Sequence, residues 1–287
     1  MAKMRLKFTK MQALGNDYVY INCMNGANPV AHPEDLAVKL SDRRTGIGGD
    51  GIILIKDAKD CAARMEIYNA DGSRAEMCGN GLRCVAKYLY DKGYARQREM
   101  RILTDAGVKT ACIEEGLSTA ELIKVSVGRA DFSPEAVPVL CDKPFIEKAL
   151  EAGGRTFICT CLSVGNPHCV VFSEDIEDAE VCVAGRAIET NPLFPRRINA
   201  GFVKVISPCE IRLKVWERGS GFTGACGTGA CAAVAAGAVT GRLECQKEIT
   251  VRQNGGNLTV QITDGEIYLT GRAQTVFEGE TELPRTY

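Results

Sequence analysis

The feature of this sequence that most constrains its fold is an internal repeat around two cysteines. Met77 to Cys84 reads "MCGNGLRC" and Ala225 to Cys231 reads "ACGTGAC", so each copy has a cysteine before a Gly-x-Gly turn and a run of helix-forming residues. Cys226 follows Cys78 by 148 positions (226 minus 78). At this offset four glycine pairs also coincide: Gly79 with Gly227, Gly81 with Gly229, Gly93 with Gly241 and Gly107 with Gly255. Self-similarity at a fixed offset predicts two homologous halves.

Segments that precede the cysteines repeat in the same order. Nearly the same offset superposes "GNDYVYI" (15–21) on "GNPHCVVF" (165–172), and "DGIILI" (50–55) on "GFVKVI" (201–206). Between the two copies, "VGRADFSPEAVP" (127–138) carries turn-forming residues. Because 287 residues are enough for two domains, we predict an N-terminal half, residues 1–127, and a C-terminal half, residues 128–272.

Strand-like runs dominate the chain, and few segments have the periodicity of a long helix. The predicted strands are Tyr18–Asn22, Gly51–Ile55, Ala63–Asn69, Cys169–Phe172, Gly201–Ile206 and Glu210–Trp216. The predicted helices are Pro33–Ser41, Gly79–Lys92, Pro144–Ala152 and Gly227–Thr240. Many strands with few helices predict an α+β fold.

The repeat places both Cys78 and Cys226 at or just before the start of a helix. Unpaired N–H groups and the helix dipole stabilise an anion there, so we expect the pKa of each thiol to fall below its free value of about 8.5. The following glycine lets a substrate carboxylate approach the backbone amides. If the halves face each other, one sulfur can remove a proton from an α-carbon while the other delivers one to the opposite side. The pattern predicts racemisation or epimerisation without metal or cofactor.

Other uses of the cysteines fit the sequence less well. A chain of this length needs no disulfide framework. No C-x-x-C pair occurs, and Cys159-Thr-Cys161 has the wrong spacing for a structural zinc finger. Neither Gly-x-Gly belongs to a P-loop or to a complete dinucleotide fingerprint. Cys84 and Cys231, inside the two predicted helices, are expected in the core.

Charge and hydropathy indicate the kind of partner and the compartment. The chain has 35 basic and 36 acidic residues, a net charge of -1 and no basic block, so a small-molecule partner is expected and a nucleic acid is not. The N-terminal segment "MAKMRLKFTKMQ" has no uninterrupted apolar region. The most apolar run, Ala230–Val239, is shorter than the roughly 20 residues that span a bilayer. We expect a soluble cytoplasmic protein without a membrane partner.

Polar residues beside the repeated strands are candidates for a substrate cleft. "NADGS" (69–73) follows a strand of the first half, and "ERGSG" (217–221) has the corresponding place in the second. Glu217 and Arg218 suit the ammonium and carboxylate groups of an amino acid.

Asparagine and histidine side chains near the first repeated strand are further candidates. Asn16 and Asn166 are equivalent in the repeat, and each can hydrogen-bond a polar substrate. His168, one of two histidines, lies just before a strand and can position or polarise a thiol.

Taken together, these segments resemble the diaminopimelate epimerase family, whose members interconvert LL- and meso-diaminopimelate without a cofactor, on the route to lysine and peptidoglycan. The resemblance covers the whole chain. It rests on six motifs in the family's order and spacing: "KMQALGNDYVYI", "GIGGDGIILI", "YNADGSRAEMCGNGLRC", "SVGNPHCVVF", "FPRRINAGFVKVI" and "WERGSGFTGACGTGACA".

The resemblance implies two pseudo-symmetric domains, each a mixed β-sheet wrapped around a central helix, with residues 273–287 returning to the first half. It implies Cys78 and Cys226 as the acid–base pair, with His168 and Glu217 tuning the thiols. The substrate's reacting carboxylate would lie on the backbone amides of Gly79, Asn80, Gly227 and Thr228. Its distal amino acid would be held by Asn16, Asn69, Asn166, Asn199, Glu217 and Arg218.

Related families keep an alternative open. Proline and histidine racemases share the two halves, so a racemase of another amino acid that uses the same cysteines is the second hypothesis. Glu217 and Arg218 beside the asparagines favour a substrate with a second zwitterionic end. At two positions the chain departs from the family's pattern: Gly51 stands where some members have glutamine, and Phe222 where many have an acidic residue. The expected partner is a free amino acid, that is, a small-molecule substrate. A homodimer is the expected form of any assembly.

Overall fold

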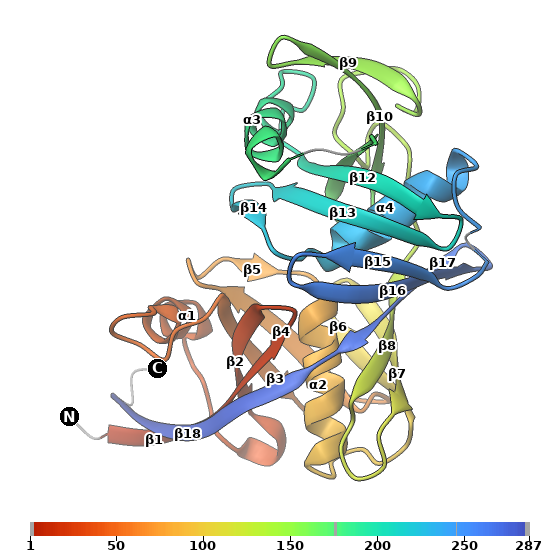
Figure 1. The fold of residues 1–287 in the computed structure, drawn as a ribbon. Helices are drawn as coiled ribbons and strands as arrows, with labels where there is room; N and C mark the ends of the chain where they lie inside the picture. The colour runs from red at the N-terminus through yellow and green to blue at the C-terminus, as the bar shows by residue number, and fades with distance from the viewer. Residues whose placement is uncertain (1–2, 175–176, 245, 285–287) are drawn as a thin grey trace. The chain divides into compact units, whose positions relative to one another are not determined.

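The computed structural model describes residues 3–174, 177–244 and 246–284. The chain divides into two compact units. Unit 1 comprises residues 1–125 and 271–287, and unit 2 comprises residues 126–270. Each unit has its own run of paired strands and two α-helices, coloured by residue number in Figure 1. Residues 285–287 of the segment expected to return to the first half lie outside the described residues.

Unit 1 is built from one mixed run of strands. The strands are β1 (Lys3–Ala13), β2 (Asn16–Asn22), β3 (Gly51–Lys56), β4 (Ala63–Asn69), β5 (Arg74–Ala75), β6 (Glu99–Thr104), β7 (Gly107–Glu115), β8 (Leu122–Gly128) and β18 (Gln274–Pro284). The last strand, β18, pairs antiparallel with β1, the first, although the two are far apart in sequence. Strands β2 and β3 are parallel, and helix α1 (Pro33–Ser41) connects them.

Helix α2 (Gly79–Asp91) is the central element of unit 1. It contacts β1, β2, β6, β7 and β18, so strands lie on several of its sides (Figure 1). Its side chains Leu82, Val85 and Leu89 have no exposed surface. A helix buried on most sides needs apolar residues around most of its circumference. The predicted helix Gly79–Lys92 and the expected core position of Cys84 are confirmed.

Unit 2 repeats the same plan. Its strands are β9 (Lys148–Ala152), β10 (Arg155–Ser163), β11 (Pro167–Phe172), β12 (Asn199–Ser207), β13 (Glu210–Glu217), β14 (Gly221–Thr223), β15 (Ile249–Gln253), β16 (Gly256–Thr263) and β17 (Glu266–Arg272). Helix α4 (Gly227–Val239) contacts β10, β11, β12, β13 and β16, whereas α3 (Asp178–Glu189) packs on β9, β12, β13 and β14.

The order of strand pairing is the same in the two units. In unit 1, β2 pairs parallel with β3, β3 antiparallel with β4, and β4 parallel with β6. In unit 2, β11 pairs parallel with β12, β12 antiparallel with β13, and β13 parallel with β15. The predicted fold class is therefore confirmed: two pseudo-symmetric units, each a mixed sheet around a central helix.

One predicted helix is wrong. Residues 148–152 of the predicted helix Pro144–Ala152 form β9, which pairs antiparallel with β10. The hairpin turn consists of Gly153 and Gly154, both with positive φ (56° and 73°), and Gly-Gly suits a two-residue hairpin turn. Leu150 and Ala152 are buried while Ala149 and Glu151 are exposed. This alternation, together with the pairing partner, outweighs the helix propensity of the segment.

Helix α3 was not predicted, although the repeat implies it. It connects the parallel strands β11 and β12 just as α1 connects β2 and β3. Parallel neighbours require a crossover, which is usually a helix.

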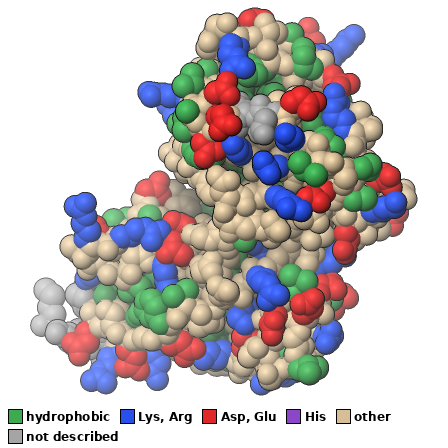
Figure 2. Space-filling model, viewed as in Figure 1, with side chains coloured by type: hydrophobic (Ala, Val, Ile, Leu, Met, Phe, Trp, Pro, Cys, Tyr) green, Lys and Arg blue, Asp and Glu red, His purple; other side chains and the backbone are tan. Residues whose placement is uncertain are grey.

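The surface is mixed in charge. On the face shown in Figure 2, Lys and Arg side chains are interspersed with Asp and Glu over both units. Among the described residues, no helix combines the length and the apolar character needed to cross a membrane.

Candidate active site

Cys78 caps the start of the central helix of unit 1. It is the N-cap residue of α2 in an extended conformation, and the Gly81 N–H donates to its Sγ at 3.3 Å. The thiol donates to Asn16 Oδ1 at 3.5 Å. Asn16 is held in turn, since its Nδ2 donates to Asp50 at 2.7 Å. The thiol of Cys78 therefore lies between a helix start and an amide whose orientation Asp50 fixes.

Cys226 has the equivalent position in unit 2. It is the N-cap residue of α4, and the Gly229 N–H donates to its Sγ at 3.3 Å. Its own backbone N–H donates to Gln253 Oε1 at 2.8 Å. The thiol donates to Glu217 Oε2 at 3.3 Å and lies 3.5 Å from Thr228 Oγ1. Both predicted cysteines thus have the geometry of a helix cap that the sequence indicated.

A glycine lies three residues after each capping cysteine, where the start of the helix is close to a strand. A Cβ on Gly81 would lie 2.7 Å from Ile53 Cδ1, and a Cβ on Gly229 would lie 3.1 Å from Val215 Cγ2. Both distances are shorter than ordinary van der Waals contact. These two glycines therefore let the strands approach the thiols.

The expected fall in thiol pKa does not occur. Burial raises the pKa of Cys78, and the hydrogen bond from Gly81 and the charge of Arg83 oppose the rise only in part. Burial also raises the pKa of Cys226, to which the nearby Glu217 carboxylate adds. Loss of water around a thiolate outweighs the stabilisation that a helix start provides. In the substrate-free protein, burial therefore disfavours the thiolate form of both residues.

The residue that ends the strand before each thiol differs between the two units. These two residues, Asn69 and Glu217, lie 148 positions apart, the offset of the repeat. In unit 2, Glu217 accepts hydrogen bonds from Cys226 and from Thr223 Oγ1, the latter at 2.6 Å. In unit 1 the equivalent residue is Asn69, whose Nδ2 donates to Ser73 Oγ at 3.0 Å. A carboxylate therefore faces the Cys226 thiol, whereas the equivalent residue of unit 1 is uncharged and bonds to Ser73.

His168 acts on a neighbouring amide. It is buried, and its Nε2 lies 3.0 Å from Asn166 Oδ1. Because burial lowers the pKa of His168 to about 3, helped by the charge of Arg218, the ring is neutral and Nε2 carries the proton that Asn166 Oδ1 accepts. Asn166 Nδ2 then donates to Thr228 Oγ1 at 3.2 Å. A chain of hydrogen bonds thus runs from His168 through Asn166 and Thr228 to Cys226.

Asn199 and Arg218 occupy the same region of unit 2. Asn199 is buried, its Nδ2 donates to the Pro167 carbonyl at 2.7 Å, and its Oδ1 accepts from the Arg218 N–H at 2.9 Å. The Arg218 guanidinium donates to the Arg196 carbonyl at 3.2 Å. Both polar ends of Asn199 therefore bond to the protein and fix the backbone where Arg218 begins.

Three residues that the sequence analysis missed support the site. Asp50 orients Asn16 and accepts from Arg43 at 3.0 Å. Arg83, fully buried in α2, donates to Asn80 Oδ1 at 2.6 Å. Gln253 accepts from the Cys226 N–H. Asp50 and Arg83 both lie in quoted motifs, and an arginine inside a helix expected to be central was the signal that could have found Arg83.

The two departures from the family's pattern have packing explanations. A Cβ on Gly51 would lie 2.2 Å from the Tyr68 carbonyl oxygen, so this strand position excludes any side chain. Phe222, on β14, packs against the hydrophobic core of unit 2.

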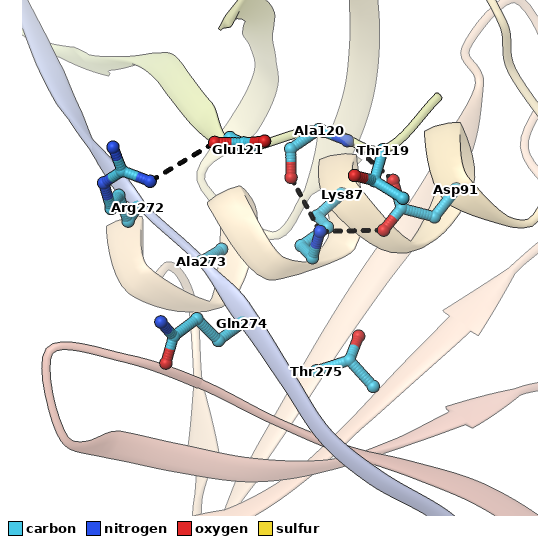
Figure 3. Close-up of a pocket in the computed structure, with 9 residues that line it drawn as sticks. All are labelled: Lys87, Asp91, Thr119, Ala120, Glu121, Arg272, Ala273, Gln274 and Thr275. Atoms are coloured by element: carbon cyan, nitrogen blue, oxygen red, sulfur yellow. Dashed lines mark hydrogen bonds and ion pairs between the residues drawn. The ribbon is translucent and has the colours of Figure 1, made fainter. Parts of the chain in front are cut away.

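A separate pocket of about 460 Å³ lies in unit 1 beside α2 (Figure 3). Lys87, Asp91, Glu121 and Arg272 are among the residues that line it. Lys87 Nζ already bonds to the Ala120 carbonyl at 2.6 Å and to Asp91 at 2.8 Å, as the dashed lines in Figure 3 show. None of the predicted site residues lines this pocket, and its buried cation is already neutralised.

Sequence comparison identifies close relatives. The family model described as diaminopimelate epimerase matches residues 8–133 and 160–276. A diaminopimelate epimerase of Acetivibrio thermocellus is 42% identical over 281 residues, which cover 97% of this chain and 99% of the relative. Another, of Desulfitobacterium hafniense, is 44% identical over 278 residues, which cover 96% and 97% respectively.

Solved structures share the fold at low sequence identity. A hydroxyproline epimerase from Agrobacterium vitis has a TM-score of 0.70 and 16% identity, with 100% of this chain and 94% of that chain covered. A PhzF-family phenazine biosynthesis protein from Bacillus anthracis has a TM-score of 0.67 and 17% identity, with 97% and 99% covered. At these identities the likeness concerns the fold alone.

Proposed function

Because the chain belongs to the diaminopimelate epimerase family, a family of isomerases, we propose that it converts LL-diaminopimelate into meso-diaminopimelate with Cys78 and Cys226 as the paired base and acid. The observation that carries this proposal is the equivalence of the two thiols. Each is the N-cap of a central helix, and each accepts one backbone N–H from a glycine three residues on.

The reaction exchanges one proton for another at a single carbon. The thiolate of one cysteine takes the α-proton, leaving the electron pair on the α-carbon and its carboxylate. The thiol of the other cysteine gives its proton to the opposite side, so the C–H bond is restored with inverted configuration. Afterwards the first cysteine is a thiol and the second a thiolate, and the roles are ready for the reverse reaction. No metal or cofactor takes part in these steps.

The side-chain partners favour one starting assignment. The Glu217 carboxylate accepts a hydrogen bond from the Cys226 thiol and repels a negative charge on its sulfur. Cys226 therefore favours the protonated state, in which it can act as the acid. Cys78 faces the neutral Asn16 amide, and the charge of Arg83 favours its ionised form. We therefore assign Cys78 as the base and Cys226 as the acid for the LL substrate.

The amides of the two helix starts would hold the reacting carboxylate. The sulfur atoms already accept from Gly81 and Gly229, so the amides before them in the first turn, Gly79 with Asn80 and Gly227 with Thr228, are the proposed donors. Donors fixed before the reaction stabilise the charge that develops on this carboxylate.

The distal amino acid would be recognised by polar residues of both units. We propose Asn16, Asn69, Asn166, Glu217 and Arg218 as direct contacts. Asn199 would act through Arg218, whose backbone it holds, and His168 would act through Asn166, whose amide it orients. His168 is thus proposed as a positioning residue, which acts on Cys226 through Asn166 and Thr228.

The wider setting is part of the proposal. Two homologous halves, residues 1–127 with 273–287 and residues 128–272, would each supply one thiol. The substrate would be a free amino acid, a small molecule of the cytoplasm. Neither a nucleic acid nor a membrane is proposed as a partner. A homodimer is compatible with this activity.

Isotope exchange tests the mechanism directly. In deuterated water, the wild type should place deuterium on the α-carbon of LL-diaminopimelate as meso product forms. Cys78→Ser and Cys226→Ser keep a good helix cap but replace the acidic thiol, so each should fold normally and turn over at least 100-fold more slowly, the lower end of what a positioned acid or base contributes. Cys84→Ser, at a buried cysteine of helix α2, is the control and should keep the wild-type rate. A folded, reduced wild type that gives no exchange would refute the proposal.

Assays with a panel of amino acids distinguish diaminopimelate epimerisation from racemisation of another amino acid. A racemase of the histidine or proline type would turn over those amino acids and leave diaminopimelate unchanged. Loss of activity in Arg218→Ala toward diaminopimelate, through a higher KM, supports recognition of a second zwitterionic end.

A further inference from the structure

Three cysteines of unit 2, none of them Cys226, lie together. Cys159 and Cys161 are on β10 and Cys169 is on β11, and their sulfur atoms all lie within 4.8 Å of one another. Cys161 is directly opposite Cys169 in the antiparallel ladder. Cys159, two residues before Cys161, points to the same face. The ladder therefore brings three thiols to one point.

The surroundings of this cluster are buried and apolar. All three cysteines are buried, at 2% exposure or less, and belong to the core that includes Val181, Ile188 and Phe202. Helix α3, which carries Val181 and Ile188, contributes to this core. Isolated cysteines pack well in such a core as small apolar residues, but three sulfurs directed at a common centre also form a set of soft ligands.

We propose that Cys159, Cys161 and Cys169 form a binding site for a thiophilic d¹⁰ cation, Zn²⁺ or Cu⁺. Metal–sulfur bonds of about 2.3 Å in a trigonal arrangement place the sulfurs about 4 Å apart, so the observed cluster needs only a small contraction. Binding of Zn²⁺ as a tris-thiolate releases three protons to solvent and leaves a single net negative charge. Both cations favour thiolate ligands.

A cation here would join two strands of unit 2 without entering the reaction. Cys169 is next to His168 in sequence, but successive side chains of a strand point to opposite faces. The cluster therefore faces the core on one side of β11, while His168 faces Asn166 on the other. Its expected effect is to fasten β10 to β11 and so to stabilise the strand that carries His168.

Metal content and coordination test this site in the full-length protein. The chain is expressed under reducing conditions with Zn²⁺ or with Cu⁺, and is also refolded with each, because buried ligands are best loaded during folding. After weakly bound metal has been removed with a chelator, one cation per chain should remain. X-ray absorption should show three sulfur neighbours at about 2.3 Å. The two loading arms tell which cation the site prefers.

Matched variants assign the ligands. Cys159→Ala/Cys161→Ala/Cys169→Ala should lose the retained cation and the rise in Tm that it gives the wild type. Cys231→Ala, at an equally buried cysteine of unit 2, should retain both. If the triple variant does not fold, the single variant Cys161→Val should lower the sulfur coordination number. A wild type that retains no cation in either arm, or a triple variant that retains as much as the wild type, overturns the proposal and leaves an apolar thiol cluster.

Discussion

At the residue scale, the two proposed catalytic sulfurs share a backbone partner and differ in their side-chain partners. Each accepts a glycine N–H at 3.3 Å, yet Cys78 donates to an amide and Cys226 to a carboxylate. An enzyme that inverts a carbon needs one base and one acid at any moment. Glu217, whose equivalent in the first repeat is the uncharged Asn69, supplies the carboxylate on the Cys226 side.

Removing the charge of Glu217 should make Cys226 easier to ionise. Glu217→Gln keeps an acceptor oxygen but removes the repulsion that raises the pKa of the thiol. In a Cys78→Ser background, the rate of Cys226 alkylation by iodoacetamide should therefore begin to rise at lower pH than with Glu217 present. Glu210→Gln, at the other end of β13, should leave this pH profile unchanged. An identical profile in Glu217→Gln would contradict the assigned role.

Single residues were predicted well where the backbone motif defines them. Cys78 and Cys226 lie at helix starts because Cys-Gly-x-Gly before an apolar run is a local pattern. The direction of their pKa shifts was predicted wrongly, because desolvation depends on atoms that the rest of the chain supplies. The contacts of His168 with Asn166, and of Arg83 with Asn80, are likewise set by packing.

At the scale of elements, the distance between helix start and strand decides where each thiol lies. Gly81→Ala adds a methyl group 2.7 Å from Ile53 Cδ1, so α2 must shift or the side chain of Ile53 must move. We expect a loss of about 1–3 kcal/mol in unfolding free energy, together with a fall in kcat as Cys78 is displaced.

A second substitution can relieve this clash. Ile53→Val removes the Cδ1 atom that the new methyl group would meet, so Gly81→Ala/Ile53→Val should recover most of the stability and kcat lost by Gly81→Ala alone. Urea unfolding and steady-state rates of the four proteins complete the cycle. Strictly additive losses would show that Ile53 is not the obstacle.

The wrong helix and the missed helix have one physical origin. Residues 148–152 have helix-forming side chains, but β10 offers them a hydrogen-bonded edge, and β9 forms there. Helix α3 is required because β11 and β12 are parallel and adjacent. Both facts concern pairing between strands, which propensity within a short window does not report.

At the scale of the whole molecule, the proposed mechanism requires the two units to present their thiols to one carbon. A mild thiol oxidant such as diamide, which accepts two electrons and two protons, should then join Cys78 to Cys226 and abolish activity. A reductant should restore the two free thiols and the activity. Peptide mapping without reduction identifies the linked pair.

The control for this oxidation is a single cysteine variant. Cys78→Ser leaves Cys226 without its partner, so diamide should give no linked peptide that contains Cys226. If the wild type keeps its activity in diamide while its other thiols react, the two sulfurs do not converge.

The duplicated order of elements, the two capping cysteines and the family can be read from the amino-acid sequence alone, because they depend on local patterns that recur at a fixed offset. The pairing of β9 with β10, the direction of the thiol pKa shifts, the hydrogen bonds of His168 and the proximity of Cys159, Cys161 and Cys169 follow from tertiary contacts. Capping and turn formation involve residues a few positions apart, whereas burial and strand register bring together residues that are distant along the chain.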